Sequence, residues 1–273
     1  MIPRRGWVAG DASGAFYSVR DFWTRDGVTV IIPWCGYGDK KRFLGGWRAQ
    51  EYNEPLIIHI IDSGSLPENR WSVPAMDFND PAGNDAVIIN SRLAVESVYW
   101  ASDAVAMALD AGFSMAQTKY VVCSHSDVYL TDPLALSTLI SKMDDGEWDI
   151  VGPRMSPRYF IQEPNPYPAH TFTAYRMTAV WRRGLTWGFR RDALDFNGSN
   201  IDPVCYDTEV SFGFQAIRAG LKILITGEEP NEPYETPWYF HDRSASCHGI
   251  YANQSERNLK LIDVCPRWKR GNV

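Results

Sequence analysis

Four short runs of apolar, largely β-branched residues recur along the first half of the chain. They are VTVIIP (28–33), LIIHII (56–61), AVII (86–89) and YVVC (120–123). Apolar runs of this length, without alternation, are typical of strands that are buried on both faces of a sheet. A polar or glycine-containing segment follows each run, such as WCGYGDK after the first and DSGS after the second. The pattern therefore predicts core strands with loops at their carboxyl ends.

Segments with helical periodicity separate these runs. Apolar residues recur at helical spacing over 91–117, which predicts the longest helix of the chain. Residues 40–52 can form a shorter helix. Asp132 and Pro133 predict the start of another helix, because a carboxylate can cap a helix and proline suits its first position. Strands that alternate with helices in this way predict a three-layer α/β/α arrangement around a mostly parallel central sheet.

The second half of the chain is less regular. Residues 66–85 and 153–170 are rich in proline and polar residues and are expected to form loops, the second of them long enough to cover a site. Residues 148–151 predict a further strand, and residues 171–187 are expected to be extended. The segment 207–219 predicts a helix with acidic residues at its start.

Charge and cysteine content narrow the functional classes. A net charge of -6 without a long basic run argues against a nucleic-acid surface and against a polybasic membrane anchor. No stretch reaches the length of an integral membrane segment, and the N-terminus lacks the apolar core of a signal peptide. The five cysteines are widely spaced without a paired motif, which favours reduced thiols and a cytoplasmic location.

A possible metal site follows the fourth run, where the sequence reads His125-Ser126-Asp127. In an open α/β sheet, ligands bind at the carboxyl ends of the strands. An imidazole and a carboxylate two residues apart can face one cation; Mn²⁺ accepts mixed nitrogen and oxygen ligands, whereas Mg²⁺ prefers oxygen. The alternative is that Asp127 caps a turn and His125 is an ordinary core residue.

Acidic residues at two other places can serve either a functional or a structural role. Asp62, after the second run, can accept hydrogen bonds from a base or a ribose, or it can simply stabilise a turn. Asp207 and Glu209 stand at the start of a predicted helix. Either carboxylate can act as a general base, but helix capping and a favourable contact with the helix dipole are the commoner roles.

The order of these segments resembles the GT-A fold glycosyltransferases, in particular the broad family 2-like group of nucleotide-sugar transferases. The resemblance rests on VTVIIPWCG, IIHIIDSGS, the long helix, VVCSHSDVYL, IVGPRM and YDTEVSFGFQAIRAGLKIL, and it covers about residues 28–226. It implies a single GT-A domain over residues 1–273. The nucleotide-sugar-binding half would span about 28–152, and the acceptor-binding half with the C-terminal tail about 153–273.

The same resemblance implies which residues hold the donor. The expected nucleotide-binding residues are Pro33, Trp34, Asp62, Ser63, Ser65, Ser126 and Asp127. A divalent cation, Mn²⁺ or Mg²⁺, would be bound by Asp127, which occupies the last position of the family's DxD motif. His125 replaces the first Asp of that motif, so it can contact either the metal or the nucleotide. His241 fits the position of a C-terminal histidine ligand better than His248 does.

For the reaction itself, the resemblance implies Asp207 as the catalytic base, with Glu209 as a competitor. Trp181 and Trp187 would lie on the acceptor side and stack on a sugar, or pack in the core. The expected activity is transfer from a nucleotide-sugar donor, a UDP-sugar, to a carbohydrate-containing acceptor with inversion, as in polysaccharide biosynthesis. The alternatives are a non-catalytic nucleotide- or carbohydrate-binding protein of the same fold, or a nucleotidyltransferase.

Overall fold

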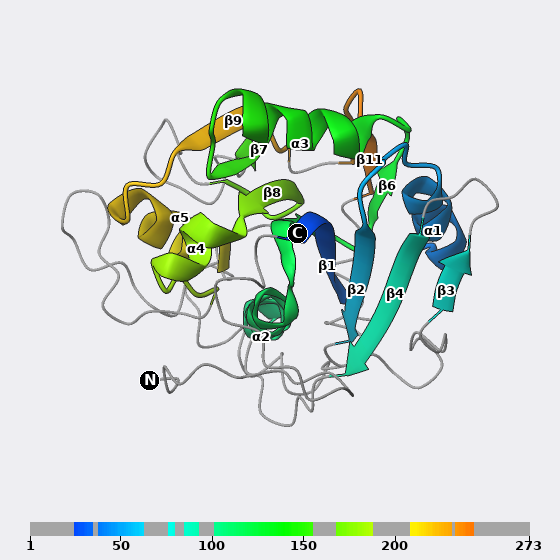
Figure 1. Ribbon diagram of the computed structural model, residues 1–273, viewed down its shortest axis with the longest axis horizontal. Helices are drawn as coiled ribbons and strands as arrows, with labels where there is room; N and C mark the ends of the chain where they lie inside the picture. The colour runs from blue at the N-terminus through cyan, green and yellow to red at the C-terminus, as the bar shows by residue number, and fades with distance from the viewer. Residues whose placement is uncertain are drawn as a thin grey trace, which may run out of the picture.

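An eight-stranded sheet organises the protein, with strand order β3-β4-β2-β1-β5-β8-β7-β9 (Figure 1). The computed structural model describes residues 25–34, 38–62, 76–79, 85–92, 101–154, 168–187, 208–230 and 233–242. The strands of this sheet are β1 (Arg25–Trp34), β2 (Leu56–Asp62), β3 (Met76–Asn79), β4 (Asp85–Arg92), β5 (Thr118–Ser124), β7 (Ile150–Arg154), β8 (Phe172–Arg176) and β9 (Ile223–Glu228).

The centre of the sheet is parallel. β4, β2, β1 and β5 pair in parallel, as do β7 and β9, whereas β3 at one edge and β8 in the second half run antiparallel to their neighbours. All four apolar runs of the sequence lie in the parallel part. The predicted α/β class with a mostly parallel central sheet is therefore confirmed.

Helices cover both faces of the sheet and make the three layers. They are α1 (Lys40–Arg48), α2 (Ala101–Met115), α3 (Ala135–Asp145), α4 (Met177–Arg182) and α5 (Thr208–Arg218). Because side chains alternate along a strand, each core strand supplies two apolar clusters. In β5, Val122 packs in the cluster beneath α1 and α3, while Val121 packs in the cluster beneath α2, α4 and α5.

A small second sheet joins the C-terminal part of the chain to the loop after β5. Its strands are β6 (Val128–Leu130), β10 (Tyr234–Glu235) and β11 (Tyr239–His241), in the order β10-β11-β6. The antiparallel register places His241 opposite Val128, so His241 lies next to the His125-Ser126-Asp127 segment. The sheet thereby brings together residues that are far apart in the sequence.

The helix α1 backs this small sheet closely. A Cβ atom on Gly46 would lie 2.7 Å from the carbonyl oxygen of Leu130, so only glycine permits this approach. The guanidinium carbon of Arg42 lies 4.5 Å from the ring centroid of Tyr129 and 4.8 Å from that of Phe240. These cation–π contacts fasten α1 to β6 and β11.

Several predicted boundaries are wrong. The long helix begins at Ala101, because Ser91 and Arg92 extend β4, where they pair with Ile61 and Asp62 of β2. β3 forms inside the predicted loop 66–85, where the short segment Met76–Asn79 pairs with the edge of β4.

Two helix predictions also need correction. α3 begins at Ala135, and Asp132 instead accepts a hydrogen bond from the backbone nitrogen of Leu134 in the preceding turn. The second part of the segment 171–187, expected to be extended, forms α4. Its residues Met177 and Val180 stand three apart, as on one face of a helix, and both are buried.

The predicted covering loop falls mainly on residues 155–167, which lie outside the described residues. Within the ranges that the structure describes, no helix is long and apolar enough to cross a membrane.

Candidate metal centre and active site

The predicted nucleotide-binding positions that the structure describes lie at one edge of the sheet. Trp34 and Asp62 are register partners at the carboxyl ends of β1 and β2, with Pro33 one residue earlier in β1. Both side chains are buried: Trp34 has no exposed surface and Asp62 is 3% exposed. The Lys40 Nζ lies 5.6 Å from the Trp34 ring centroid. Ser63 and Ser65 lie outside the described residues.

The segment His125-Ser126-Asp127 forms a tight connection at this same edge, between β5 and β6. The backbone nitrogen of Val128 donates to the carbonyl of His125 at 3.3 Å, and that of His125 donates to the carbonyl of Thr171 at 3.2 Å. Gly38, with φ of +117°, lies against it so closely that a Cβ would be 2.5 Å from the Ser126 carbonyl oxygen. Gly38, which lies between β1 and α1, therefore touches the candidate metal segment directly.

His125, Asp127 and His241 converge into one cluster of possible metal ligands. One donor atom from each lies within 4.8 Å of the other two. The Nε2 of His241 is 3.3 Å from Oδ1 of Asp127, and the Nδ1 of His125 is 3.9 Å from the same oxygen. The structure therefore brings together the three residues that the sequence named as candidate metal ligands.

The donor set suits a divalent transition metal. Both ring nitrogens of His125 are buried, and neither has a hydrogen-bond partner among the described residues. Leaving such nitrogens unsatisfied is costly, so the arrangement is better explained by a ligand that completes it. Two imidazoles and one carboxylate match the mixed nitrogen and oxygen preference of Mn²⁺ better than the oxygen preference of Mg²⁺.

The surroundings of Asp127 and His125 shift the pKa values of both side chains. Burial alone would raise the pKa of Asp127, but the contact with His241 and the charge of that ring hold it at about 2. Burial, together with His170 and His241, lowers the pKa of His125 well below its usual value. Asp127 is therefore ionised and His125 neutral near pH 7, which are the forms that bind a cation.

His241 is different because it lies between two carboxylates. Burial would lower its pKa, but Asp127 and Glu229 raise it to about 9. The Nδ1 of His241 is 3.2 Å from Oε1 of Glu229. Near pH 7 this ring therefore carries a proton on each nitrogen, and it must lose one of them to become a ligand.

A second buried pair, His170 and Glu209, adjoins the first cluster. The Nδ1 of His170 lies 2.7 Å from Oε1 of Glu209, which also accepts the backbone N–H of His170 at 2.8 Å. The ring centroids of His170 and His125 are 4.4 Å apart. Glu209 lies in the first turn of α5, two residues after Asp207, which is outside the described residues.

Sequence reasoning missed two of these residues, His170 and Glu229. His170 precedes β8, which is antiparallel to β5, so the start of β8 lies at the same edge as the end of β5. Glu229 follows β9, which is parallel to β7. Their positions next to strand ends were visible in the sequence, but β8 was not recognised as antiparallel.

The acceptor prediction named two tryptophans. Trp187 is 1% exposed and stacks on Phe212 with ring centroids 4.0 Å apart and planes inclined by 12°. Trp187 therefore packs in the core and is not exposed for stacking on a sugar. Trp181 lies in α4.

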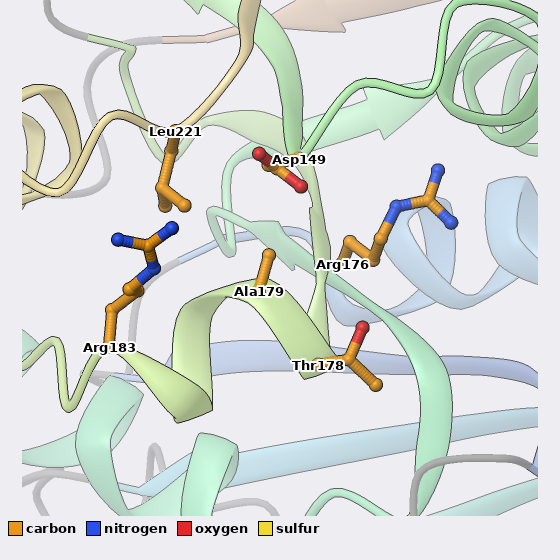
Figure 2. A pocket seen from close by; sticks show the side chains of 6 residues that line it. All are labelled: Asp149, Arg176, Thr178, Ala179, Arg183 and Leu221. Atoms are coloured by element: carbon orange, nitrogen blue, oxygen red, sulfur yellow. The ribbon is translucent and has the colours of Figure 1, made fainter.

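A pocket of about 250 Å³ lies elsewhere, around α4 (Figure 2). Arg176 lines the pocket and is the register partner of Tyr120, near the start of β5. Its guanidinium already donates to the carbonyls of Trp148 and Met143. His125, in contrast, follows the end of β5. The pocket is therefore at the opposite end of β5 from the histidine cluster.

The strand order and the three layers are those of the GT-A fold. The chain is similar in structure to TarS from S. aureus, with a TM-score of 0.51 and 12% sequence identity. The match covers 86% of this chain and 40% of TarS.

Two further similar structures have TM-scores of 0.47. The mannosyltransferase PcManGT from Pyrobaculum calidifontis, in complex with GDP-Man and Mn²⁺, is 16% identical over 93% of this chain and 67% of its own. S. aureus TarS 1-349 in complex with UDP-GlcNAc is 11% identical, and the match covers 86% of this chain and 66% of that one. No protein-family model and no curated protein sequence matches the chain.

Proposed function

We propose that this protein is a metal-dependent glycosyltransferase that moves a sugar from a nucleotide sugar, a UDP-sugar, to a carbohydrate-containing acceptor with inversion. The observation that carries the proposal is the convergence of His125, Asp127 and His241 at the carboxyl edge of a GT-A sheet. In sheets of this type, ligands bind at that edge.

His125, Asp127 and His241 would hold the cation, with Asp127 as its anionic ligand. A bound divalent cation would neutralise the negative charge of the nucleoside diphosphate leaving group. Pro33, Trp34 and Asp62 adjoin the same edge, which supports their assignment to the nucleotide. Because Trp34 is fully buried, we assign it to the wall behind the base and not to an open stacking face.

We assign the general base to Asp207. It would take the proton from the acceptor hydroxyl while that oxygen attacks the anomeric carbon and the nucleoside diphosphate leaves from the opposite face. The competing carboxylate, Glu209, is buried against both the ring and the backbone nitrogen of His170. Such a position favours a supporting role for Glu209 and so supports Asp207 as the base.

Thermal unfolding with a panel of nucleotide sugars, each with and without Mn²⁺, tests the proposal. A ligand at a hundred times its dissociation constant stabilises the native state by about 2.7 kcal/mol. We expect one class of nucleotide sugar to stabilise the wild type only when Mn²⁺ is present, and to have no effect on Asp127→Ala. Stabilisation that is indifferent to Mn²⁺, without turnover, would instead favour the non-catalytic binding protein.

A further inference from the structure

A buried carboxylate directly after β9 has no role in the reaction described above. The last three residues of β9 are exposed, including Glu228, but the next residue, Glu229, is only 3% exposed. A carboxylate is seldom buried unless it is paired and hydrogen-bonded, because removing it from water is costly. Glu229 must therefore be stabilised by specific partners, and these partners indicate its role.

Those contacts connect Glu229 to the candidate metal cluster. Its Oε1 lies 3.2 Å from Nδ1 of His241, and the opposite ring nitrogen, Nε2, lies 3.3 Å from Asp127. The three side chains form a continuous carboxylate–imidazole–carboxylate chain in which none is more than 3% exposed. In metal sites, a carboxylate on the far nitrogen of a histidine ligand fixes the orientation of the ring and strengthens the ligand.

Glu229 is itself held in place from two sides. The hydroxyl of Thr171 donates a hydrogen bond to Oε1, and the backbone nitrogen of Glu229 donates to the carbonyl of Arg154 at 3.0 Å. The carbonyl of Thr171 also accepts the backbone N–H of His125. Thr171 thus connects the support of His241 to the backbone of a second candidate ligand.

We propose that Glu229 is a positioning residue of the cation site, which holds the His241 ring with Nε2 directed at Asp127 and at the cation. This inference rests on the proposed metal-dependent function. It adds a residue that acts through His241 and does not itself touch the cation. Thr171 completes the support by orienting the Glu229 carboxylate.

The test is direct Mn²⁺ binding, measured from the loss of the free-ion electron paramagnetic resonance signal, first with Mn²⁺ alone and then with UDP. The variants are Glu229→Gln and Thr171→Val, with Asp127→Ala as the site knockout. Glu228→Gln is the matched control, because Glu228 is adjacent, exposed and paired with Arg154 outside the cluster. Unfolding of each variant in a chelator checks that it is folded.

We expect Glu229→Gln to weaken Mn²⁺ binding by about 10- to 100-fold, and Thr171→Val to weaken it less, while Glu228→Gln binds as the wild type does. If Glu229→Gln and Thr171→Val are folded and bind within about twofold of Glu228→Gln, the inference is overturned and the metal site survives. If Glu229→Gln does not fold, the Mn²⁺ affinity of Thr171→Val is compared with that of Glu228→Gln instead, and a difference within about twofold overturns the inference. If wild type and Asp127→Ala bind Mn²⁺ equally, the metal site and this inference both fail.

Discussion

Two adjacent glycines in α1 allow a sharp test of how this helix supports the candidate site. A Cβ on Gly46 would lie 2.7 Å from the Leu130 carbonyl oxygen and 3.0 Å from its backbone nitrogen, whereas a Cβ on Gly45 would meet nothing within 4 Å. Ordinary contacts begin at 3.4 Å, so Gly46→Ala requires α1 and β6 to separate by several tenths of an ångström. Overpacking of this kind costs about 1–3 kcal/mol.

The pair of variants isolates this steric cost. In a helix, alanine is about 1 kcal/mol more favourable than glycine, and both substitutions gain that amount. We therefore expect Gly45→Ala to be more stable than the wild type, and Gly46→Ala to be less stable than Gly45→Ala by about 1–3 kcal/mol. Urea unfolding with unchanged m values measures both. Equal stabilisation by the two substitutions would refute the close contact between α1 and β6.

The remaining predictions concern the chemistry of single side chains. Burial lowers the pKa of His59 to about 4 from the ordinary 6.5, so the folded state binds this proton less well than the unfolded state. Stability should consequently fall as pH drops from about 6.5 towards 4, by about 2 kcal/mol at pH 5, and urea unfolding of His59→Gln should lack this part of the loss. Asp207→Asn should abolish transfer with nucleotide affinity nearly unchanged in calorimetry; if Glu209→Gln behaves this way instead, the base is misassigned. Mn²⁺ should support turnover better than Mg²⁺, because two of the three proposed ligands are imidazoles, and a preference for Mg²⁺ in a metal titration would contradict that ligand set.

The sheet could largely be predicted because its signal is local. Four of the strands contain a mainly apolar run, and the structure places all four runs in the parallel part of the sheet. The errors occur where pairing overrides local preference. β3 has only four residues, too few for a clear local signal, and forms through its pairing with β4. Ser91 is polar and joins β4 through its register partner Ile61.

The candidate site was predicted only in part, for a related reason. His125 and Asp127 follow a recognisable strand, and the resemblance to a family supplied His241. His170 and Glu229 gain their positions from the antiparallel pairing of β8 and from the path of the chain after β9, which local sequence does not encode. The burial of Trp187 could not be predicted either, because its local sequence gives no sign that its ring stacks on Phe212.

Release of nucleoside diphosphate from a UDP-sugar, compared between the wild type and Asp127→Ala, tests the central claim most directly. We predict Mn²⁺-dependent release by the wild type that increases with a carbohydrate acceptor, and a loss of about 100-fold or more in folded Asp127→Ala. Full activity of that variant, or release of pyrophosphate in place of UDP, would contradict the account.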